Sequence, residues 1–374
     1  MSTPATTAAS TAASTAASTP VGAPAGAPTA GAVVRLADLT TLRVGGPARR
    51  LVGARTEDEL VDAVRSADAA GQPVLVVGGG SNLLVGDGGF DGTVVLVRTG
   101  GVRVESADAC GGALVRVAAG EDWDALVART VADGLAGMEA MSGIPGSTGA
   151  TPVQNVGAYG QEVADTLARV TTWDRREGRR RTFAAAECGF GYRWSRFKAE
   201  PGRFVVLDVV FQLALSELST PVRYPALAGE LGVAVGQRVP LADVREAVLR
   251  LRRRRGMVVD AHDPDTWSAG SFFTNPVLDA AAAAALPQGA PRFDAGGGRV
   301  KTSAAWLIEH AGFARGHGLP GPAAISTKHT LALTNRGGAS AADVLALARE
   351  VRDGVRERFG LELVPEPDLV GCSL

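Results

Sequence analysis

A glycine-rich stretch at residues 142–160, SGIPGSTGATPVQNVGAYG, is the part of the sequence best suited to hold a ligand. Its glycine and proline spacing fits neither an amphipathic helix nor an alternating strand. Backbone N–H groups in such a loop can form a concave anion site, because glycine lets the main chain approach a ligand closely. A turn-rich connector is the alternative, but long loops inside compact domains are usually functional. We therefore favour a ligand-binding loop.

A second glycine-rich run, VVGGGSNLLV at 76–85, could also bind an anion. Two familiar phosphate motifs do not fit it. The dinucleotide fingerprint needs a third glycine where Leu83 stands, and the nucleoside-triphosphate loop needs a Gly-Lys-Ser/Thr that does not follow. Taken alone, the run fits a tight strand-to-loop turn as well as a pyrophosphate cradle. The residues that would form the cradle are Gly78, Gly79, Gly80, Ser81 and Asn82.

The composition argues against several classes of protein. The chain has 374 residues, enough for two or three domains. Its 38 Lys and Arg balance 39 Asp and Glu, which argues against binding to nucleic acid or to a membrane surface. The three cysteines, Cys110, Cys188 and Cys372, are far apart, which indicates a reducing compartment and no disulfide framework. Because the four histidines are also scattered, we expect no metal site.

Residues 1–32 are dominated by Ala, Thr, Ser, Pro and Gly, with TAAS repeated at 7–10, 11–14 and 15–18. An uncharged segment with so few large apolar groups is predicted to be a disordered tail. It lacks the basic start and the apolar run of a secretory signal. Elsewhere no apolar stretch is long enough to span a bilayer. We therefore expect a cytoplasmic protein and, as the default, a monomer.

The residues that must position the two loops predict an α+β region. Thr56 and Glu59 have the spacing of a capping box at the start of a helix. A second helix begins near Trp123 and ends at Gly134. Apolar runs and alternating patterns predict strands around these helices. The predicted strands lie at 40–52, where a glycine turn separates two short strands, at 73–85, where a strand runs into the glycine loop, and at 93–97, 113–120, 169–174 and 204–215.

The second half of the chain changes character and is mainly helical. Ser340 with Asp343 marks the start of the last long helix, which ends at Gly360. The run RLRRRR at 250–255 is best interpreted, for most of its arginines, as a solvated helix end whose charges suit the helix dipole. The predicted helices cover 241–254, 280–285, 302–313 and 340–359, and a strand followed by an acidic turn is predicted at 361–371.

Seven motifs in this order resemble the UDP-N-acetylenolpyruvoylglucosamine reductase family, and the resemblance covers residues 40–371. The motifs are RVGGPA (43–48), VVGGGSNLLV (76–85), IPGSTGATPVQNVGAYG (144–160), FGYRWSRFK (190–198), AGSFFTNP (269–276), KTSAAWLIEHAGF (301–313) and VPEP (364–367).

The resemblance implies an α+β architecture whose FAD-binding region belongs to the PCMH type, in which loops rather than a Rossmann crevice hold the pyrophosphate. It places a first FAD-binding lobe at 33–98, a second at 99–216 and a C-terminal α+β substrate-binding domain at 217–374. It also implies tightly bound FAD, NADPH as the hydride donor, and a UDP-sugar substrate. Its enolpyruvyl ether would be reduced in the synthesis of a bacterial peptidoglycan precursor.

The resemblance further assigns three catalytic residues. Arg193 matches the arginine that faces the substrate carboxylate, a role suited to a planar and permanently charged fork. Ser271 matches the proton donor, and Glu366 matches an acid that stabilises the enol intermediate. Without the resemblance, a surface salt bridge would be favoured for Arg193 and a turn serine for Ser271, and an exposed C-terminal acid is the alternative for Glu366. Glu362 is the competing choice for the acid.

The binding residues follow from the same motifs. Tyr224 matches a tyrosine on a mobile loop in one subtype of the family, and Arg255 stands where relatives often carry lysine. The arginine run leaves the alignment of Arg255 open by one residue. For FAD the candidates are Gly78, Gly79, Gly80, Ser81, Asn82, Ile144, Gly146, Ser147, Gly149 and Gly157. For the substrate they are Tyr159, Tyr192, Tyr224, Arg255, Asn275, Lys301 and His329.

Two other functions compete with this interpretation. One is a flavin oxidase with the same cofactor fold, acting with oxygen on a sugar or lactone. The other is a catalytically silent protein that binds a UDP-sugar and regulates wall synthesis. The presence of Arg193 and Ser271 argues against both.

Overall fold

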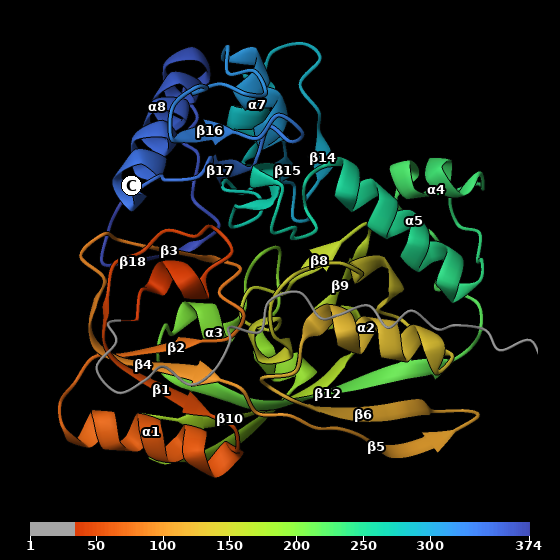
Figure 1. Cartoon of the computed structure of the whole chain (residues 1–374). Helices are drawn as coiled ribbons and strands as arrows, with labels where there is room; N and C mark the ends of the chain where they lie inside the picture. Colours follow the sequence, from red (N-terminus) through yellow and green to blue (C-terminus); the bar gives the residue numbers. More distant parts are fainter. Residues whose placement is uncertain (1–33) are drawn as a thin grey trace, which may run out of the picture.

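The computed structural model describes residues 34–374, so the predicted tail at 1–32 lies outside the described part of the chain. Two sheets with their helices form the lower part of Figure 1, and the helices of the C-terminal region lie above them. The regions 34–98, 99–216 and 217–374 are called lobe 1, lobe 2 and the C-terminal region below. No helix within 34–374 is both long and apolar enough to cross a bilayer.

Lobe 1 is a three-stranded parallel sheet in the order β1–β4–β2, built from β1 (Ala48–Ala54), β2 (Val74–Val77) and β4 (Phe90–Val97). The crossover helix α1 (Glu57–Ala69) connects β1 to β2, which run parallel on either side of β4. The capping box of Thr56 and Glu59 is confirmed. The strand expected ahead of β1 was wrong, because positive φ angles at Arg43 and Gly45 turn the chain there. Short elements complete the lobe: η1 (Leu36–Leu39) and β3 (Leu83–Val85).

Lobe 2 is a larger antiparallel sheet in the order β11–β10–β12–β6–β5, with β7 paired to the end of β12. Its longest strand is β12, which occupies the predicted range 204–215 to the residue. One face packs on α2 through Trp123 and Phe211, whose rings meet edge to face 5.9 Å apart. The elements are β5 (Val102–Asp108), β6 (Gly112–Ala118), α2 (Trp123–Ala132), β7 (Leu135–Ala136), β10 (Leu167–Asp174), β11 (Arg179–Ala184) and β12 (Phe204–Leu215).

The glycine-rich stretch 142–160 crosses the middle of the molecule with little regular structure. Asn155 and Tyr159 adopt positive φ angles of 48° and 49°, which non-glycine residues rarely do. Short turns punctuate this part of the chain and the segment that follows it: η2 (Glu139–Met141), η3 (Thr148–Ala150), β8 (Gly157–Ala158), β9 (Gln161–Glu162), η4 (Val163–Asp165), η5 (Ala185–Cys188) and α3 (Arg196–Ala199).

The C-terminal region begins with the helical pair α4 (Pro225–Leu231) and α5 (Leu241–Arg254). The long helix α8 (Ala341–Phe359) starts at the predicted capping box of Ser340 and Asp343 and ends at Gly360. The other elements are η6 (Pro264–Thr266), β13 (Val277–Leu278), α6 (Ala280–Ala284), β14 (Phe293–Asp294), β15 (Val300–Lys301), α7 (Ala304–His310), β16 (Ala323–Ile325), β17 (Leu333–Asn335) and β18 (Asp368–Val370).

The end of the chain returns to lobe 1, which the expected strand at 361 did not anticipate. Residues 361–367 are irregular, since Pro365 and Pro367 have no N–H to donate to a ladder. The strand is instead β18, and it pairs in parallel with β3. Lobe 1 is also joined to α8, because the Asp87 carboxylate accepts from the first backbone N–H groups of that helix. The predicted domain boundaries stay a prediction, since these contacts cross them.

Candidate functional site

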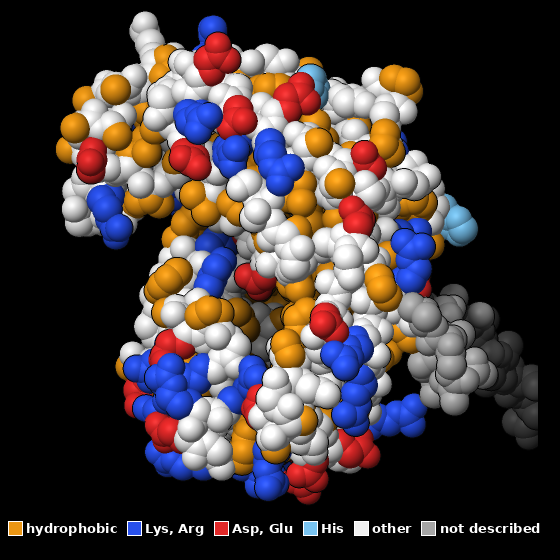
Figure 2. Space-filling view, turned by 90° about the vertical axis from the view of Figure 1, so that its left-hand side faces the viewer, with side chains coloured by type: hydrophobic (Ala, Val, Ile, Leu, Met, Phe, Trp, Pro, Cys, Tyr) orange, Lys and Arg blue, Asp and Glu red, His pale blue; other side chains and the backbone are white. Residues whose placement is uncertain are grey.

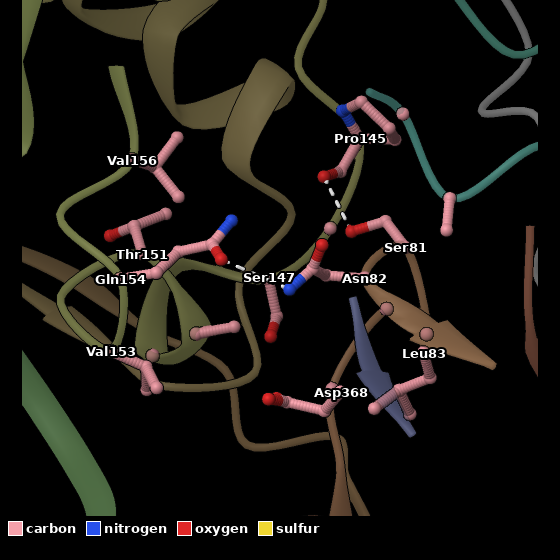
Figure 3. A pocket seen from close by; sticks show the side chains of 18 of the residues that line it. Ser81, Asn82, Leu83, Pro145, Ser147, Thr151, Val153, Gln154, Val156 and Asp368 are labelled. Atoms are coloured by element: carbon pink, nitrogen blue, oxygen red, sulfur yellow. Dashed lines mark hydrogen bonds between the residues drawn. The ribbon is translucent and has the colours of Figure 1, made fainter. Parts of the chain in front are cut away.

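The two glycine-rich loops meet with their main chains in contact. The Ser81 hydroxyl donates to the Pro145 carbonyl at 2.9 Å, as the dashed line in Figure 3 shows. A Cβ added to Gly79 would lie 2.5 Å from the Gly146 Cα, and one added to Gly78 would lie 2.0 Å from the Ser147 Oγ. Any side chain at these glycines would therefore collide with the opposite loop. The close packing of the two loops therefore depends on glycine at these positions as well as on hydrogen bonds.

The loop 144–149 is held by backbone hydrogen bonds to the residues that follow β6 in lobe 2. The backbone N–H groups of Thr148 and Gly149 donate to the carbonyls of Glu121 and Ala119, each at 2.8 Å. A Cβ on Gly149 would lie 2.5 Å from the Ala119 Cβ. This packing fixes the loop 144–149 at the end of β6 and presents it toward lobe 1.

A cavity of about 450 Å³ lies between these loops, lobe 2 and the C-terminal region. This volume falls within the range of small-molecule sites. All ten residues predicted to bind the cofactor line it. In Figure 2 the surface is hollowed between the upper and lower parts of the molecule, with hydrophobic side chains along the hollow.

The three predicted catalytic residues come from separate segments and line this same cavity. Arg193 lies in a tight turn and has a positive φ of 52°. Its Nε is 2.7 Å from Glu366 Oε1, but the N–H is not aligned for a hydrogen bond, so the contact is an ion pair. Ser271 is partly buried on the wall formed by the segment 266–271. The structure thus brings a guanidinium, a hydroxyl and a carboxyl group to one cavity.

Glu366 is almost fully buried, and its electrostatic environment is mixed. Burial raises the pKa of its carboxyl, whereas the positive charges of Arg193 and Lys198 act in the opposite direction. Burial is the largest effect, so the net direction is upward. An anionic ligand competing for Arg193 would raise the pKa of Glu366 further.

The predicted substrate residues form two groups at the edge of the cavity. In the first, the Tyr192 hydroxyl accepts from the Asn275 N–H at 3.3 Å, and the Lys301 Nζ lies 4.5 Å from the centre of the Tyr192 ring. In the second, Tyr159 and Tyr224 meet edge to face with ring centres 5.5 Å apart.

His329 lies near the same arginines as the tyrosine pair. Burial lowers its pKa to about 4, and the charges of Arg255 and Arg252 act in the same direction. The same two arginines lower the pKa of Tyr159, although burial outweighs them and the net direction is upward. None of the seven predicted substrate residues is among those that line the cavity described above.

Sequence reasoning missed two residues that line the cavity. Gln154 accepts from Asn82 Nδ2 at 3.0 Å and donates to Glu366 Oε1 at 3.4 Å. It therefore connects the glycine loop 76–85 to the Glu366 carboxyl group (Figure 3 labels Asn82 and Gln154). Its position inside the motif 144–160 was the available signal. Arg252 is buried, although the arginine run was interpreted mainly as solvated. Arg250 and Arg254 fit that interpretation, because both are exposed and pair with Glu230.

The residues present fit the pyrophosphate of FAD. Successive residues of the two glycine loops line the cavity, and the backbone groups of such loops suit phosphate oxygens. The apolar side chains of Val74, Val76 and Val206 line another part of the cavity, as a site for flat rings requires.

Comparisons with known proteins agree with this fit. Residues 48–184 match the family model described as FAD binding domain. Residues 262–370 match the model described as UDP-N-acetylenolpyruvoylglucosamine reductase, C-terminal domain.

Whole-chain relatives carry the same description. The chain is 58% identical over 348 residues to a UDP-N-acetylenolpyruvoylglucosamine reductase of Cutibacterium acnes, covering 92% of each chain. It is 56% identical over 351 residues to one of Thermobifida fusca, covering 91% of this chain and 98% of the relative. Among solved structures, the reductase of Thermus caldophilus superposes with a TM-score of 0.61 at 28% identity, covering 90% of this chain and 97% of the other.

Proposed function

Because this chain belongs to the UDP-N-acetylenolpyruvoylglucosamine reductase family, we propose that it reduces the enolpyruvyl ether of UDP-N-acetylglucosamine enolpyruvate to the lactyl ether of UDP-N-acetylmuramate, with NADPH as the reductant. The chain is an oxidoreductase with an FAD-binding domain. One observation carries the residue assignments: Arg193, Ser271 and Glu366, from three distant segments, line the same cavity as the glycine loops.

The reaction adds a hydride and a proton across one carbon–carbon double bond. FAD, when bound and reduced by NADPH, supplies the hydride to the terminal alkene carbon. The electron pair of the double bond then moves toward the substrate carboxylate, which takes on the charge of an enolate. A proton must next reach the carbon that bears the ether oxygen. The chain therefore has to stabilise a growing negative charge and deliver one proton.

Arg193 is placed to stabilise that charge. Its guanidinium faces the cavity and can hold a carboxylate with two parallel hydrogen bonds. Within residues 34–374 the one acidic side chain in ion-pair contact with Arg193 is Glu366, at 2.7 Å. A substrate carboxylate beside Arg193 would favour the neutral form of Glu366, which can then donate a hydrogen bond to the enolate oxygen.

Ser271 is the proposed proton donor. Its hydroxyl gives up a proton to the ether-bearing carbon, and the resulting alkoxide is reprotonated from solvent. A serine hydroxyl is a weak acid, so the developing carbanion character of the enolate supplies the driving force. The cations of Arg193 and Arg252 line the same cavity and would stabilise the transient alkoxide.

The seven residues at the cavity edge are the proposed contacts of the UDP-sugar. Arg255 and His329 lie on the side of the tyrosine pair and would face the diphosphate. Tyr224 is 40% exposed, so its side chain can move to cover a bound ligand. Its edge-to-face contact with Tyr159 positions the Tyr224 ring. The Asn275 Oδ1 accepts from the Ala304 N–H at 2.9 Å, which fixes this side chain at the first turn of α7. The proposed contacts are Tyr159, Tyr192, Tyr224, Arg255, Asn275, Lys301 and His329.

The test separates the two halves of the reaction by stopped-flow absorbance of the flavin. In Ser271→Ala, reduction of the flavin by NADPH is expected to stay within about twofold of the wild type. Its reoxidation by the enolpyruvyl substrate is expected to slow by about 10²–10⁴-fold, the usual contribution of a general acid.

Ser66→Ala is the matched control, because Ser66 is exposed on α1. Equal losses in both half-reactions of Ser271→Ala would contradict the proton-donor role. A purified wild-type protein whose flavin is not bleached by NADPH would contradict the proposed reductase reaction itself.

A further inference from the structure

One wall of the cavity lies at the seam between the two lobes. Val74, Leu75 and Val76 of β2 line it from lobe 1, and the segment from Pro201 to Phe204 lines it from lobe 2. The segment 266–271 lines the cavity from the C-terminal region, which lies on the opposite side of the molecule from α1 in Figure 1. If the pyrophosphate binds at the glycine loops and the reacting ring lies near Arg193, the remaining part of the cavity, at the seam, would hold the adenosine half of FAD.

At the wall formed by β2 and the segment 201–204, the side chain of Arg175 bridges the two lobes. Arg175 follows β10 in lobe 2 and donates to both carboxylate oxygens of Asp68 on α1, at 3.0 Å from Nε and 2.5 Å from Nη2. Its Nη1 donates to the Gly202 carbonyl at 2.6 Å. The side chains of Arg175 and Asp68 are 20% and 31% exposed. A two-pronged pair with this much burial is stronger than an ordinary surface ion pair.

Other contacts within lobe 2 hold the chain at the end of β10, where Arg175 lies. The Asp174 carboxylate is fully buried and accepts from Nε and Nη2 of Arg203, which ties the end of β10 to the start of β12. The Arg175 N–H also donates to the Arg203 carbonyl at 3.0 Å. These bonds hold the base of Arg175 rigidly, so its side chain is free to act between the lobes.

The chain offers a natural comparison at the other end of α1. Arg180 of β11 lies 2.7 Å from Glu57 and 3.1 Å from Asp58, so it also joins lobe 2 to α1. Its side chain is 55% exposed and does not line the cavity that holds the glycine loops. An exposed pair of this kind contributes little to holding two surfaces together.

We propose that the Asp68–Arg175 pair is a latch that closes the seam over bound FAD and sets the rate at which the cofactor is released. Opening of the seam requires this pair to break, because it lies across the wall where the adenosine half would leave. The latch acts through position and takes no part in hydride or proton transfer. This inference rests on the FAD placement proposed above.

The experiment follows FAD release from diluted holoenzyme by the rise of free flavin fluorescence. Arg175→Met keeps the aliphatic stem and removes the fork, and Asp68→Asn keeps the shape and removes the charge. Each is expected to release FAD about tenfold faster or more, because losses of buried charge pairs act mainly on dissociation. Arg175→Lys keeps the charge without the fork and should lie between wild type and Arg175→Met.

Two further measurements separate a latch from a general structural role. The double variant Asp68→Asn with Arg175→Met should release FAD no faster than either single variant, because both remove one interaction. Arg180→Met should stay within about twofold of wild type.

Unchanged FAD release in Arg175→Met and Asp68→Asn, or equal acceleration in Arg180→Met, would overturn the latch. Either result leaves the half-reaction test of Ser271→Ala unaffected, so failure of the latch and failure of the proposed function are distinguishable. A wild-type protein that holds no FAD would overturn both.

Discussion

The glycine loops and the arginine-rich edge of the cavity are built on different principles. At the loops, Gly79 and Gly146 approach so closely that an added Cβ would lie 2.5 Å from the facing Cα. At the edge, Arg252 is buried with its Nε unbonded, and within residues 34–374 it has no carboxylate within ion-pair distance. Burial lowers the pKa of Arg252 to about 10. The structure of the glycine loops depends on the close approach of two main chains, whereas the arginine-rich edge depends on a buried positive charge.

The two regions should therefore tolerate different kinds of substitution. Contacts between two main chains cannot be relieved by rotating a side chain, so the loops should reject even a methyl group. A buried cation that forms no ion pair is costly, so an anionic ligand stabilises the edge by supplying a close negative charge. The edge should therefore respond to changes of charge and geometry more than to changes of volume. The predictions below test this contrast, beginning with the largest effect.

Gly79→Ala is expected to weaken FAD binding by more than about 100-fold. The added methyl group meets backbone atoms, and overpacking of this kind costs about 1–3 kcal/mol or more. Gly53→Ala is the matched control, because an added Cβ there has no neighbour within 4 Å. The flavin content of the purified proteins and titration of the apoproteins with FAD measure the effect. Equal FAD affinities for the two variants would break the contrast.

His329 should make folding stability depend on pH in the acidic range. Its folded pKa of about 4 lies below the ordinary 6.5, so its contribution is complete above pH 6.5 and is lost as pH falls toward 4. Over this range the unfolding free energy of wild type relative to His329→Gln should fall by up to about 3 kcal/mol. Urea unfolding from pH 7 to pH 4 measures it. Parallel curves for the two proteins would show that His329 is not buried in its neutral form.

Arg255→Lys should have the smallest effect, because the charge is kept and only the fork is lost. The KM for the UDP-sugar is expected to rise less than about threefold, whereas Arg255→Met should raise it about tenfold. Flavin reduction by NADPH is the internal reference. Arg253→Met, at an exposed position of the same run, should leave KM unchanged. An Arg253→Met effect equal to that of Arg255→Met would mean that the run acts only through its total charge.

Local patterns predicted the elements whose stability is local. The apolar run at 204–215 and the capping boxes at Thr56 and Ser340 led to the correct strand and helices, because side-chain periodicity and caps decide these elements. The strand expected at 361 failed because β18 depends on β3, which is far away in sequence. Tertiary pairing of this kind leaves no local pattern.

The site shows the same division. The glycine loops were found from composition, and the resemblance supplied Arg193, Ser271 and Glu366. The burial of Arg252 was not predictable, because the same run contains four other arginines and only the packing of α5 decides which one faces inward. The link from Asn82 through Gln154 to Glu366 joins segments more than 200 residues apart, so it became visible only in the folded chain.

The return of β18 to lobe 1 has a consequence for how the protein is made. The Asn82 Nδ2 donates to the Glu366 carbonyl, and within residues 34–374 the pairing partner of β3 is β18, at residues 368–370. A nascent chain on the ribosome therefore lacks both Glu366 and the partner of β3 until the segment 366–370 has been synthesised. Lobe 1 is made earlier and keeps an unpaired strand edge until then, and a premature stop before residue 366 yields a protein without the proposed acid.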